Sequence, residues 1–327
     1  MYKKVHDLLY RWYQKNGRHD LPWRQTNDAY AIWISEIMLQ QTQVKTVLER
    51  FYFPFLEAFP TLADLAAANL DDVLKKWEGL GYYTRAKNLH RTARICAQTL
   101  PKNIIDLNTL PGIGKSTAHA IAAFAYKIPV PILDANVKRV LYRYFALPYA
   151  TDKELWSYAD KLFDPEHPFE YNQAMMDLGA LICQAKAPQC VQCPLSLTCK
   201  GSRDNPLAYL KPKIKKKVPV RKRTIVVYKQ NERYGMQQRQ GRFLHGLWGF
   251  VQYDTHPVLN AKHLGDIIQK YSHFHLHAKV VLAETHCDEL EWFHYDEIIN
   301  LALSGADNKV LALIPGPKIN SLNATHS

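Results

Sequence analysis

Two carboxyl groups in the first half of the chain lie in contrasting sequence environments. Glu36 lies midway along a predicted helix, 30–40, where helical spacing puts it beside Ile32 and Leu39 on an apolar stripe. Burial there predicts a raised pKa, so this carboxyl could hold and donate a proton near neutral pH. Asp134 precedes another predicted helix, 135–145, whose dipole and backbone amides favour the ionised carboxylate. Two carboxyl groups with separated pKa values indicate a general acid and a standing anion.

Both carboxyl groups also have ordinary explanations. An aspartate before a helix is most often only an N-cap. A lone glutamate on an apolar face can pair with an arginine, for which Arg24 is the candidate. These alternatives stay open when each residue is considered alone.

Four cysteines form a possible metal centre. Cys183, Cys190, Cys193 and Cys199 follow the spacing Cys-x6-Cys-x2-Cys-x5-Cys. In a reducing compartment such a cluster binds metal more readily than it forms disulfides. By their chemistry alone, four thiolates could hold either Zn²⁺ or an iron–sulfur cluster.

Residues 110–114, Leu-Pro-Gly-Ile-Gly, predict a tight turn before an alanine-rich helix, 116–126. Amides at a helix N-terminus can bind a phosphate. A Walker loop requires glycine at position 109, where Thr109 stands, so we expect no nucleotide cofactor. A hairpin between two helices that grips one nucleic-acid phosphate fits better, although glycines kept only for packing remain an alternative. The predicted contacts are Gly112, Gly114, Lys115 and Ser116.

Composition agrees with an anionic polymer as partner. The chain has 327 residues, a formal net charge of +12 and a pI of about 9.3. This balance favours a polyanion as partner through counterion release. No stretch reads as a signal peptide or a membrane span, so we expect a cytoplasmic, DNA-associated protein with no membrane contact.

The composition and apolar periodicity of the sequence change near residue 202 and predict two domains. Residues 1–202 predict a helical domain that ends in the cysteine loop, 183–199. Its expected helices are 5–14, 30–40, 62–69, 71–77, 85–100, 116–126, 135–145, 152–163 and 172–183. A further helix, with Thr42 as its N-cap, is expected between the second and third of these. A basic, proline-containing linker follows at 203–222. Residues 223–316 predict a small α+β domain with strands at 224–229 and 278–283 and helices at 261–270 and 295–303, before a polar tail at 317–327.

Taken together, these segments resemble the adenine DNA glycosylases of the MutY type, in the helix-hairpin-helix superfamily that includes endonuclease III. The matching segments span nearly the whole helical domain: 21–24, 33–44, 79–90, 110–116, 133–137, 176–180 and the four cysteines. The resemblance implies an all-helical, two-lobed domain that binds double-stranded DNA and flips the target adenine out of the duplex. It also implies that the cysteines hold one [4Fe–4S] cluster, with no catalytic metal.

The resemblance assigns roles to individual residues. It makes Glu36 the acid that protonates adenine and Asp134 the anion that stabilises the oxocarbenium-like sugar. The other roles that it implies are support of this chemistry by Tyr126 and Asn136, an adenine pocket at Arg24 and Gln173, and wedging into the base stack by Gln41 and Tyr82.

One position distinguishes members of the superfamily. Relatives that also cut the strand carry a lysine nucleophile where this chain has Ser116, and a serine cannot form the Schiff base that β-elimination requires. We therefore expect a monofunctional glycosylase that leaves an abasic site. The chain departs from the family at Ala135, where glycine is usual, which affects the expected backbone approach at that position.

Segments 236–239, 247–250 and 271–275 resemble the Nudix-like C-terminal domain of the same family. The glutamate-rich Nudix box is absent, so pyrophosphatase activity is not expected. By resemblance, Ser272 and His273 recognise 8-oxoguanine opposite the adenine, although Tyr271 and Val251 depart from the usual phenylalanine and proline. Alternating histidines at 273, 275 and 277 could instead be surface residues or a fortuitous metal site.

The leading hypothesis is a monomeric enzyme that removes adenine mispaired with 8-oxoguanine or guanine from duplex DNA. An endonuclease III-like glycosylase and lyase for oxidised pyrimidines is an alternative, against which Ser116 and the extra domain argue. A catalytically silent iron–sulfur DNA-binding protein is another, against which the presence of both Glu36 and Asp134 argues.

Overall fold

The computed structural model describes residues 2–209, 218–254, 261–285 and 287–315. The middle of the predicted linker, 210–217, and the predicted tail, 317–327, lie outside the described residues. The chain divides into two compact units, 1–67 with 88–214 and 68–87 with 215–327. No helix of the described residues has both the length and the apolar character needed to cross a membrane.

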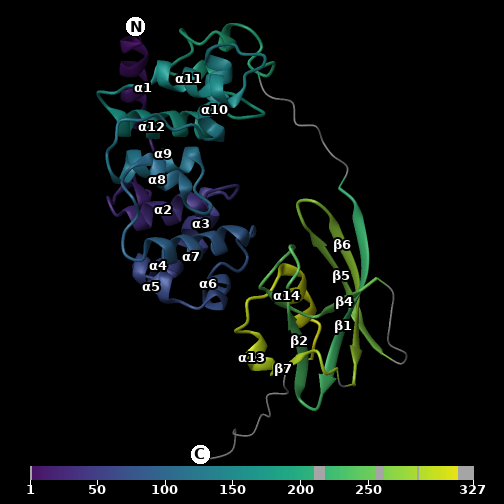
Figure 1. Cartoon of the computed structure of the whole chain (residues 1–327). Helices are drawn as coiled ribbons and strands as arrows, with labels where there is room; N and C mark the ends of the chain where they lie inside the picture. Colours follow the sequence, from purple (N-terminus) through teal and green to yellow (C-terminus); the bar gives the residue numbers. More distant parts are fainter. Residues whose placement is uncertain (1, 210–217, 255–260, 286, 316–327) are drawn as a thin grey trace, which may run out of the picture. The chain divides into compact units, whose positions relative to one another are not determined.

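The N-terminal part of the chain is helical through residue 182 (Figure 1). The helices are α1 (Lys3–Asn16), α2 (Ala29–Met38), α3 (Val44–Arg50), α4 (Tyr52–Ala58), α5 (Leu62–Ala67), α6 (Leu70–Lys76), α7 (Thr84–Cys96), α8 (Ile104–Thr109), α9 (Lys115–Ala125), α10 (Ala135–Tyr144), α11 (Asp152–Leu162) and α12 (Pro168–Asp177). A π-helical turn, Leu178–Ile182, extends α12. The predicted helices are confirmed to within a few residues, except that 85–100 ends earlier, at Cys96, and 172–183 begins earlier, at Pro168.

Short helices were harder to predict from sequence. Helices α4 and α8, of seven and six residues, were not predicted. The expected cap of α3 is also wrong: Gln43, not Thr42, is the N-cap residue.

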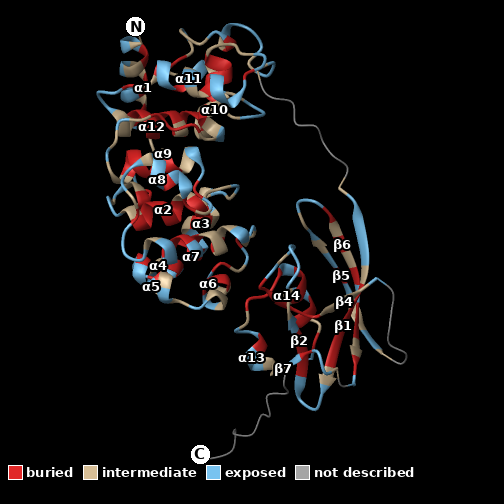
Figure 2. Cartoon of the chain, viewed as in Figure 1, coloured by how far each residue is buried: buried red, intermediate tan, exposed pale blue. Residues whose placement is uncertain are grey.

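Two apolar clusters hold the helices that carry the site. Ile32 of α2 packs with Ala120, Ala123 and Phe124 of α9, so the Glu36 helix lies against the hairpin helix. A separate cluster joins α1, α10 and α12. Figure 2 shows most of α2 and α12 as buried. The site residues on these helices are therefore held in place by core packing.

The C-terminal part forms a mixed β-sheet. Its strands are β1 (Val220–Gln230), β2 (Arg233–Gln238), β3 (Trp248–Gly249), β4 (Val251–Tyr253), β5 (Lys262–Lys270), β6 (His275–Ala283) and β7 (Glu291–His294). The strand order is β3-β2-β1-β6-β5, with β4 paired to β1 and β7 to β2. Strands β1 and β6 pair in parallel, whereas β1 pairs antiparallel with β2 and β4. Helices α13 (Tyr295–Ile298) and α14 (Gly305–Leu311) follow, and α14 packs on the sheet core.

The helix predicted at 261–270 is wrong, because this segment is strand β5, antiparallel to β6. Leu264, Ile267 and Ile268 have helix-like spacing, but a bulge between His263 and Gly265 interrupts the strand alternation there. The helix predicted at 295–303 is also shorter, since α13 ends at Ile298, and α14 was not predicted.

Candidate active site

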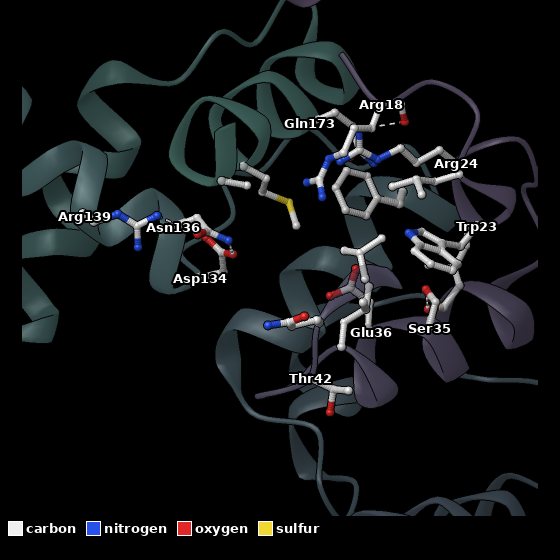
Figure 3. Close-up of a pocket in the computed structure, with 18 of the residues that line it drawn as sticks. Arg18, Trp23, Arg24, Ser35, Glu36, Thr42, Asp134, Asn136, Arg139 and Gln173 are labelled. Atoms are coloured by element: carbon white, nitrogen blue, oxygen red, sulfur yellow. Dashed lines mark hydrogen bonds between the residues drawn. The ribbon is translucent and has the colours of Figure 1, made fainter. Parts of the chain in front are cut away.

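A cavity of about 520 Å³ opens within the helical unit. Its lining includes five of the residues predicted from the sequence: Glu36, Asp134, Asn136, Arg24 and Gln173. They come from α2, the start of α10, α12 and a short 3₁₀ helix, Pro22–Arg24. The volume is within the range of small-molecule sites. Figure 3 shows Glu36 and Asp134 approaching the cavity from different segments of the chain.

Glu36 lies on the cavity side of α2, a helix whose N-cap, Asp28, accepts a hydrogen bond from the Tyr30 amide at 2.9 Å. Burial and the negative charge of Asp134 together raise the pKa of Glu36 to about 7, against an opposing effect of Arg24. The expected raised pKa of Glu36 is therefore confirmed. At neutral pH this carboxyl can hold a proton that it can also release.

Asp134 is the N-cap residue of α10. Its Oδ1 accepts the Val137 amide at 2.7 Å and its Oδ2 accepts Asn136 Nδ2 at 3.0 Å. The expectation that this capping lowers the pKa of Asp134 is nevertheless wrong. Burial raises the pKa above its ordinary value and outweighs the two hydrogen bonds. Cap geometry could be predicted from the sequence, but the depth of burial could not.

A chain of hydrogen bonds leads from Asp134 to the cysteine loop. Asn136 accepts Arg139 Nη2 at 2.8 Å, and Arg139 Nε donates to the Cys183 carbonyl at 2.6 Å. Gly179 is required beside it, because a Cβ there would lie 2.6 Å from the Asn136 Cβ. Arg139 was missed at the sequence level, since nothing in the sequence shows which carbonyl it reaches.

Arg24 does not pair with Glu36, which excludes the simpler explanation of that carboxyl. Arg24 instead donates to both oxygens of Asp177, at 2.7 and 2.9 Å, and Arg18 Nε donates to the same carboxylate at 2.8 Å. Asp177 is fully buried, and these arginines hold its pKa below the ordinary value against the effect of burial. The pairing spans more than 150 residues of sequence, which is why Asp177 was not predicted.

Gln173 offers the cavity an unused hydrogen-bond acceptor. The side chain is 3% exposed, and its Oε1 has no hydrogen-bond partner in the described part of the chain. Buried polar atoms are normally satisfied, so an orphan that faces a cavity points to a missing donor. A bound molecule with an N–H group would supply that donor.

Tyr126 does not belong to this site, which corrects the sequence-based assignment. It follows the last residue of α9, is not among the residues that line the cavity, and its hydroxyl donates to the Leu100 carbonyl at 2.9 Å. The family resemblance implied a role that the direction of the side chain does not support.

The predicted phosphate hairpin is exposed and well fixed. Gly112 has φ +77°, and a Cβ there would lie 2.8 Å from the Asn88 Cβ, so glycine is needed for both reasons. Gly114 is the N-cap of α9 and Ser116 stands in its first turn. Lys115 holds its ammonium 4.1 Å from the centroid of the Trp156 ring. The free amides at this helix start can donate hydrogen bonds to a phosphate.

The two predicted wedge residues share an unusual backbone conformation. Gln41 has φ 60° and Tyr82 has φ 50°, which non-glycine residues rarely adopt. Both are exposed, Tyr82 at 49%. Strain of this kind concentrates at functional sites.

The four cysteines line one small cavity together with Arg143. Arg143 is 2% exposed and donates to Cys183 Sγ at 3.2 Å and to the carbonyls of Cys183, Gln184, Ala185 and Pro206. Among the described residues it forms no ion pair with a carboxylate. The buried guanidinium therefore places positive charge beside the thiols.

The predicted recognition residues, Ser272 and His273, lie exposed in the loop between β5 and β6. His275 and His277 lie on β6. Within the described ranges, the only trio of close metal-ligand atoms is Asp164, Glu166 and His167, so the alternating histidines form no such group.

Known proteins resemble this chain in sequence and fold. The family model for HhH-GPD superfamily base excision DNA repair proteins matches residues 34–165. The adenine DNA glycosylase of Buchnera aphidicola subsp. Schizaphis graminum is 37% identical over 300 residues, covering 84% of this chain and 86% of that protein. The one from Buchnera aphidicola subsp. Baizongia pistaciae is 40% identical over 252 residues, covering 74% and 71%. The human adenine DNA glycosylase is 42% identical over 211 residues, covering 59% and 38%.

Solved structures agree on the helical fold. A thermostable thymine-DNA glycosylase superposes with a TM-score of 0.57 at 28% identity, over 62% of this chain and 96% of that one. An endonuclease III in complex with DNA has a TM-score of 0.53 at 21% identity, over 62% and 97%, and supports the fold alone. With identities of 37–40% across most of both chains, this protein belongs to the adenine DNA glycosylases of the HhH-GPD superfamily.

Proposed function

We propose that this chain hydrolytically removes adenine that is mispaired with 8-oxoguanine or guanine in duplex DNA and leaves an abasic site. The observation that carries the proposal is a protonatable carboxyl, Glu36, in the same cavity as a second buried carboxyl, Asp134. The family relatives are adenine DNA glycosylases, and the cavity is large enough for an extruded base.

The chemistry follows from the two environments. Glu36 donates its proton to a ring nitrogen of adenine, which turns the base into a neutral leaving group. As the glycosidic bond breaks, positive charge develops on the sugar, and the Asp134 carboxylate stabilises it. That developing charge favours ionised Asp134, opposing the effect of burial. A water molecule then adds to the anomeric carbon and gives up a proton to the Glu36 carboxylate, which leaves the abasic site and restores the acid. Asn136 orients Asp134 through their 3.0 Å hydrogen bond.

Selection of adenine rests on Gln173. The exocyclic amino group of adenine is a hydrogen-bond donor, whereas guanine carries an acceptor at the equivalent position. The unpaired Oε1 of Gln173 in the cavity therefore matches adenine and disfavours guanine. Arg24, held rigidly on Asp177, completes the pocket wall.

The reaction would stop at the abasic site because, among the described residues, the lysines next to the hairpin and near Asp134 in sequence are not ready amine nucleophiles. Ser116 stands at the position where strand-cutting relatives carry lysine. Of the nearby lysines, Lys115 stacks on Trp156 and Lys138 forms a 2.8 Å ion pair with Asp152. Because both ammonium groups are engaged in this way, neither lysine offers a neutral amine that could form a Schiff base with the sugar aldehyde.

The four cysteines would hold one [4Fe–4S] cluster. Although all four thiols are described, no three of their sulfurs lie within 4.8 Å of one another. A single tetrahedral Zn²⁺, with Zn–S bonds of about 2.3 Å, would need sulfurs roughly 3.8 Å apart. In a four-iron cluster each thiolate binds a different iron and the sulfurs stand further apart. The cluster would supply negative charge that compensates the buried Arg143 and would fix the fold of the loop.

The C-terminal sheet would read the base opposite adenine. Ser272 and His273 project from an exposed loop, where a hydroxyl and an imidazole can hydrogen-bond the oxidised edge of 8-oxoguanine. Gln41 and Tyr82, each in a strained exposed turn, would enter the base stack beside it. The hairpin at Gly112 and Gly114 would hold the backbone by one phosphate.

A substrate panel tests the proposal. The full chain is incubated with labelled duplexes that hold adenine opposite 8-oxoguanine, adenine opposite guanine, or an oxidised pyrimidine, with and without alkali. We expect adenine release from the first two and strand cleavage only after alkali. Release of the oxidised pyrimidine, cleavage without alkali, or efficient borohydride trapping would contradict it.

The cluster is tested separately. Protein purified without oxygen should contain about four iron and four sulfide per chain and absorb visible light. A colourless protein with stoichiometric zinc would overturn the cluster assignment without affecting adenine removal.

A further inference from the structure

The loop at residues 271–274, called here the recognition hairpin, fixes its exposed tip poorly by its own backbone. Within it, the Tyr271 amide donates to the Phe274 carbonyl at 2.9 Å. Ser272 and His273 are exposed, and the contact between their side chains, Oγ to Nδ1, is a long 3.4 Å. Within the hairpin, the His273 ring packs against that of Phe274, with centroids 4.9 Å apart, and further support for the tip comes from elsewhere in the unit.

A second loop, residues 239–247, supplies one aromatic ring to this hairpin. The Phe243 ring centroid lies 5.0 Å from that of Tyr271, 5.0 Å from that of His273 and 5.3 Å from that of Phe274. The first two contacts are nearly perpendicular, at 89° and 83°, which is a favoured edge-to-face geometry. Phe243 thus contacts every ring of the recognition hairpin, although it is itself 40% exposed.

The loop that carries Phe243 is closed at its base. The Arg239 amide donates to the Leu247 carbonyl at 2.9 Å, and the Gly246 amide donates to the Arg239 carbonyl at 2.7 Å. Leu244 and Gly246 both adopt positive φ, 54° and 80°. A non-glycine residue in this conformation next to Phe243 shows that the loop is held in one shape.

Both loops share one buried anchor. Asp307 at the start of α14 is fully buried and accepts Arg239 Nη2 at 3.0 Å. The hydroxyl of Tyr271 lies next to Ser304, the N-cap of the same helix. Phe243 and the recognition hairpin are consequently fixed relative to each other.

We infer that Phe243 is a positioning residue for base discrimination: it holds His273 and Ser272 in the orientation that distinguishes 8-oxoguanine from guanine. The inference rests on the proposed function and names a residue that the resemblance did not supply. A cavity of about 200 Å³ lies beside these rings, lined by Phe243, Tyr271 and Phe274. Removing the Phe243 ring would enlarge this space and let the His273 ring turn away.

The test compares Phe243→Ala with Phe243→Tyr in the full chain. Single-turnover adenine release is measured opposite 8-oxoguanine and opposite guanine, and the ratio of the two rates is the readout. Phe243→Ala should lower this ratio about two- to tenfold, mainly by slowing the 8-oxoguanine duplex, because three ring contacts are lost. Phe243→Tyr keeps the ring and should retain the wild-type ratio. Ile299→Ala, a truncation of an apolar side chain 49% exposed in the same unit, serves as the matched control and should change nothing.

Other outcomes separate this inference from the proposed function. An unchanged ratio in Phe243→Ala, or an equal fall in Phe243→Tyr, overturns the role of Phe243 while leaving adenine removal intact. An equal slowing of both duplexes also overturns it, because that result means general destabilisation. If the wild-type chain releases no adenine from either duplex, the proposed function and this inference fall together.

Discussion

The cavity around Glu36 is lined by charged side chains, whereas the recognition hairpin, 271–274, is exposed and mostly aromatic. In the cavity, burial shifts the pKa of two carboxyl groups and leaves an acceptor on Gln173 unpaired. At the hairpin, ring packing orients side chains whose polar atoms stay in water. Bond cleavage needs a desolvated proton donor, while recognition of a base edge needs groups presented outward.

This comparison predicts two kinds of variant. Changes in the cavity should slow adenine release opposite 8-oxoguanine and opposite guanine by the same factor, because the same adenine occupies the cavity in both cases. Changes at the hairpin should alter the ratio of the two rates. A variant that behaves the other way would break the division between the two regions.

The largest effect is expected from Glu36→Gln. Loss of the proton donor should slow adenine release about 10²- to 10⁴-fold on both duplexes, with duplex affinity kept. The measurement is single-turnover release beside a binding assay. Glu57→Gln on the exposed surface of α4 is the matched control and should be neutral. Near-wild-type release by Glu36→Gln would remove Glu36 from the mechanism.

The same substitution should change the pH dependence of stability. Burial raises the pKa of Glu36 from 4.5 to about 7, so the fold favours the protonated carboxyl. The stability that this protonation contributes is present below about pH 4.5 and is lost as the pH rises through about 7, by about 3 kcal/mol in total. Since glutamine does not titrate, the melting temperature of Glu36→Gln should gain on that of the wild type from about pH 4.5 to about pH 7, and the difference should level off above about pH 7. A constant difference between the two proteins would contradict the raised pKa.

A smaller effect is expected at the acceptor that faces the cavity. Gln173→Leu should lower kcat/KM about tenfold on both duplexes, because the adenine amino group would be buried without a partner. Gln14→Leu on the exposed face of α1 controls for the change in polarity. A selective loss on one duplex would instead connect Gln173 with the opposite base.

The smallest effect is expected at the hairpin tip. Ser272→Ala should lower the ratio of the two rates only a few-fold, because one solvent-exposed hydrogen bond is lost. Release opposite guanine should stay unchanged, and Ser157→Ala on α11 is the control. Equal slowing on both duplexes would argue against a recognition role for Ser272.

Much of the helical unit could be predicted from sequence, because its helices carry their own signals. Capping residues, apolar spacing and the cysteine spacing are local, and the elements that carry Glu36, Asp134 and Gln173 were predicted correctly. Prediction failed where the outcome depends on distant partners. Strand β5 was taken for a helix because only its pairing with β6 decides its form.

Prediction of the site from sequence failed for the same reason, because the missing information lies in contacts between distant residues. The pairing of Arg24 with Asp177 joins α12 to the start of the chain and has no local signature. The direction of the Asp134 pKa shift depends on burial by the assembled cavity, which a cap motif does not reveal. The resemblance gave Tyr126 a role beside Asp134, but its hydroxyl donates to the Leu100 carbonyl instead.

The pH dependence of adenine release tests the central claim most directly. With A opposite 8-oxoguanine under single-turnover conditions, the rate should fall roughly tenfold per pH unit above about pH 7, because Glu36 must carry its proton. The small residual rate of Glu36→Gln should not show this fall. A wild-type rate that stays constant or increases from about pH 6.5 to about pH 9 would contradict proton donation by Glu36.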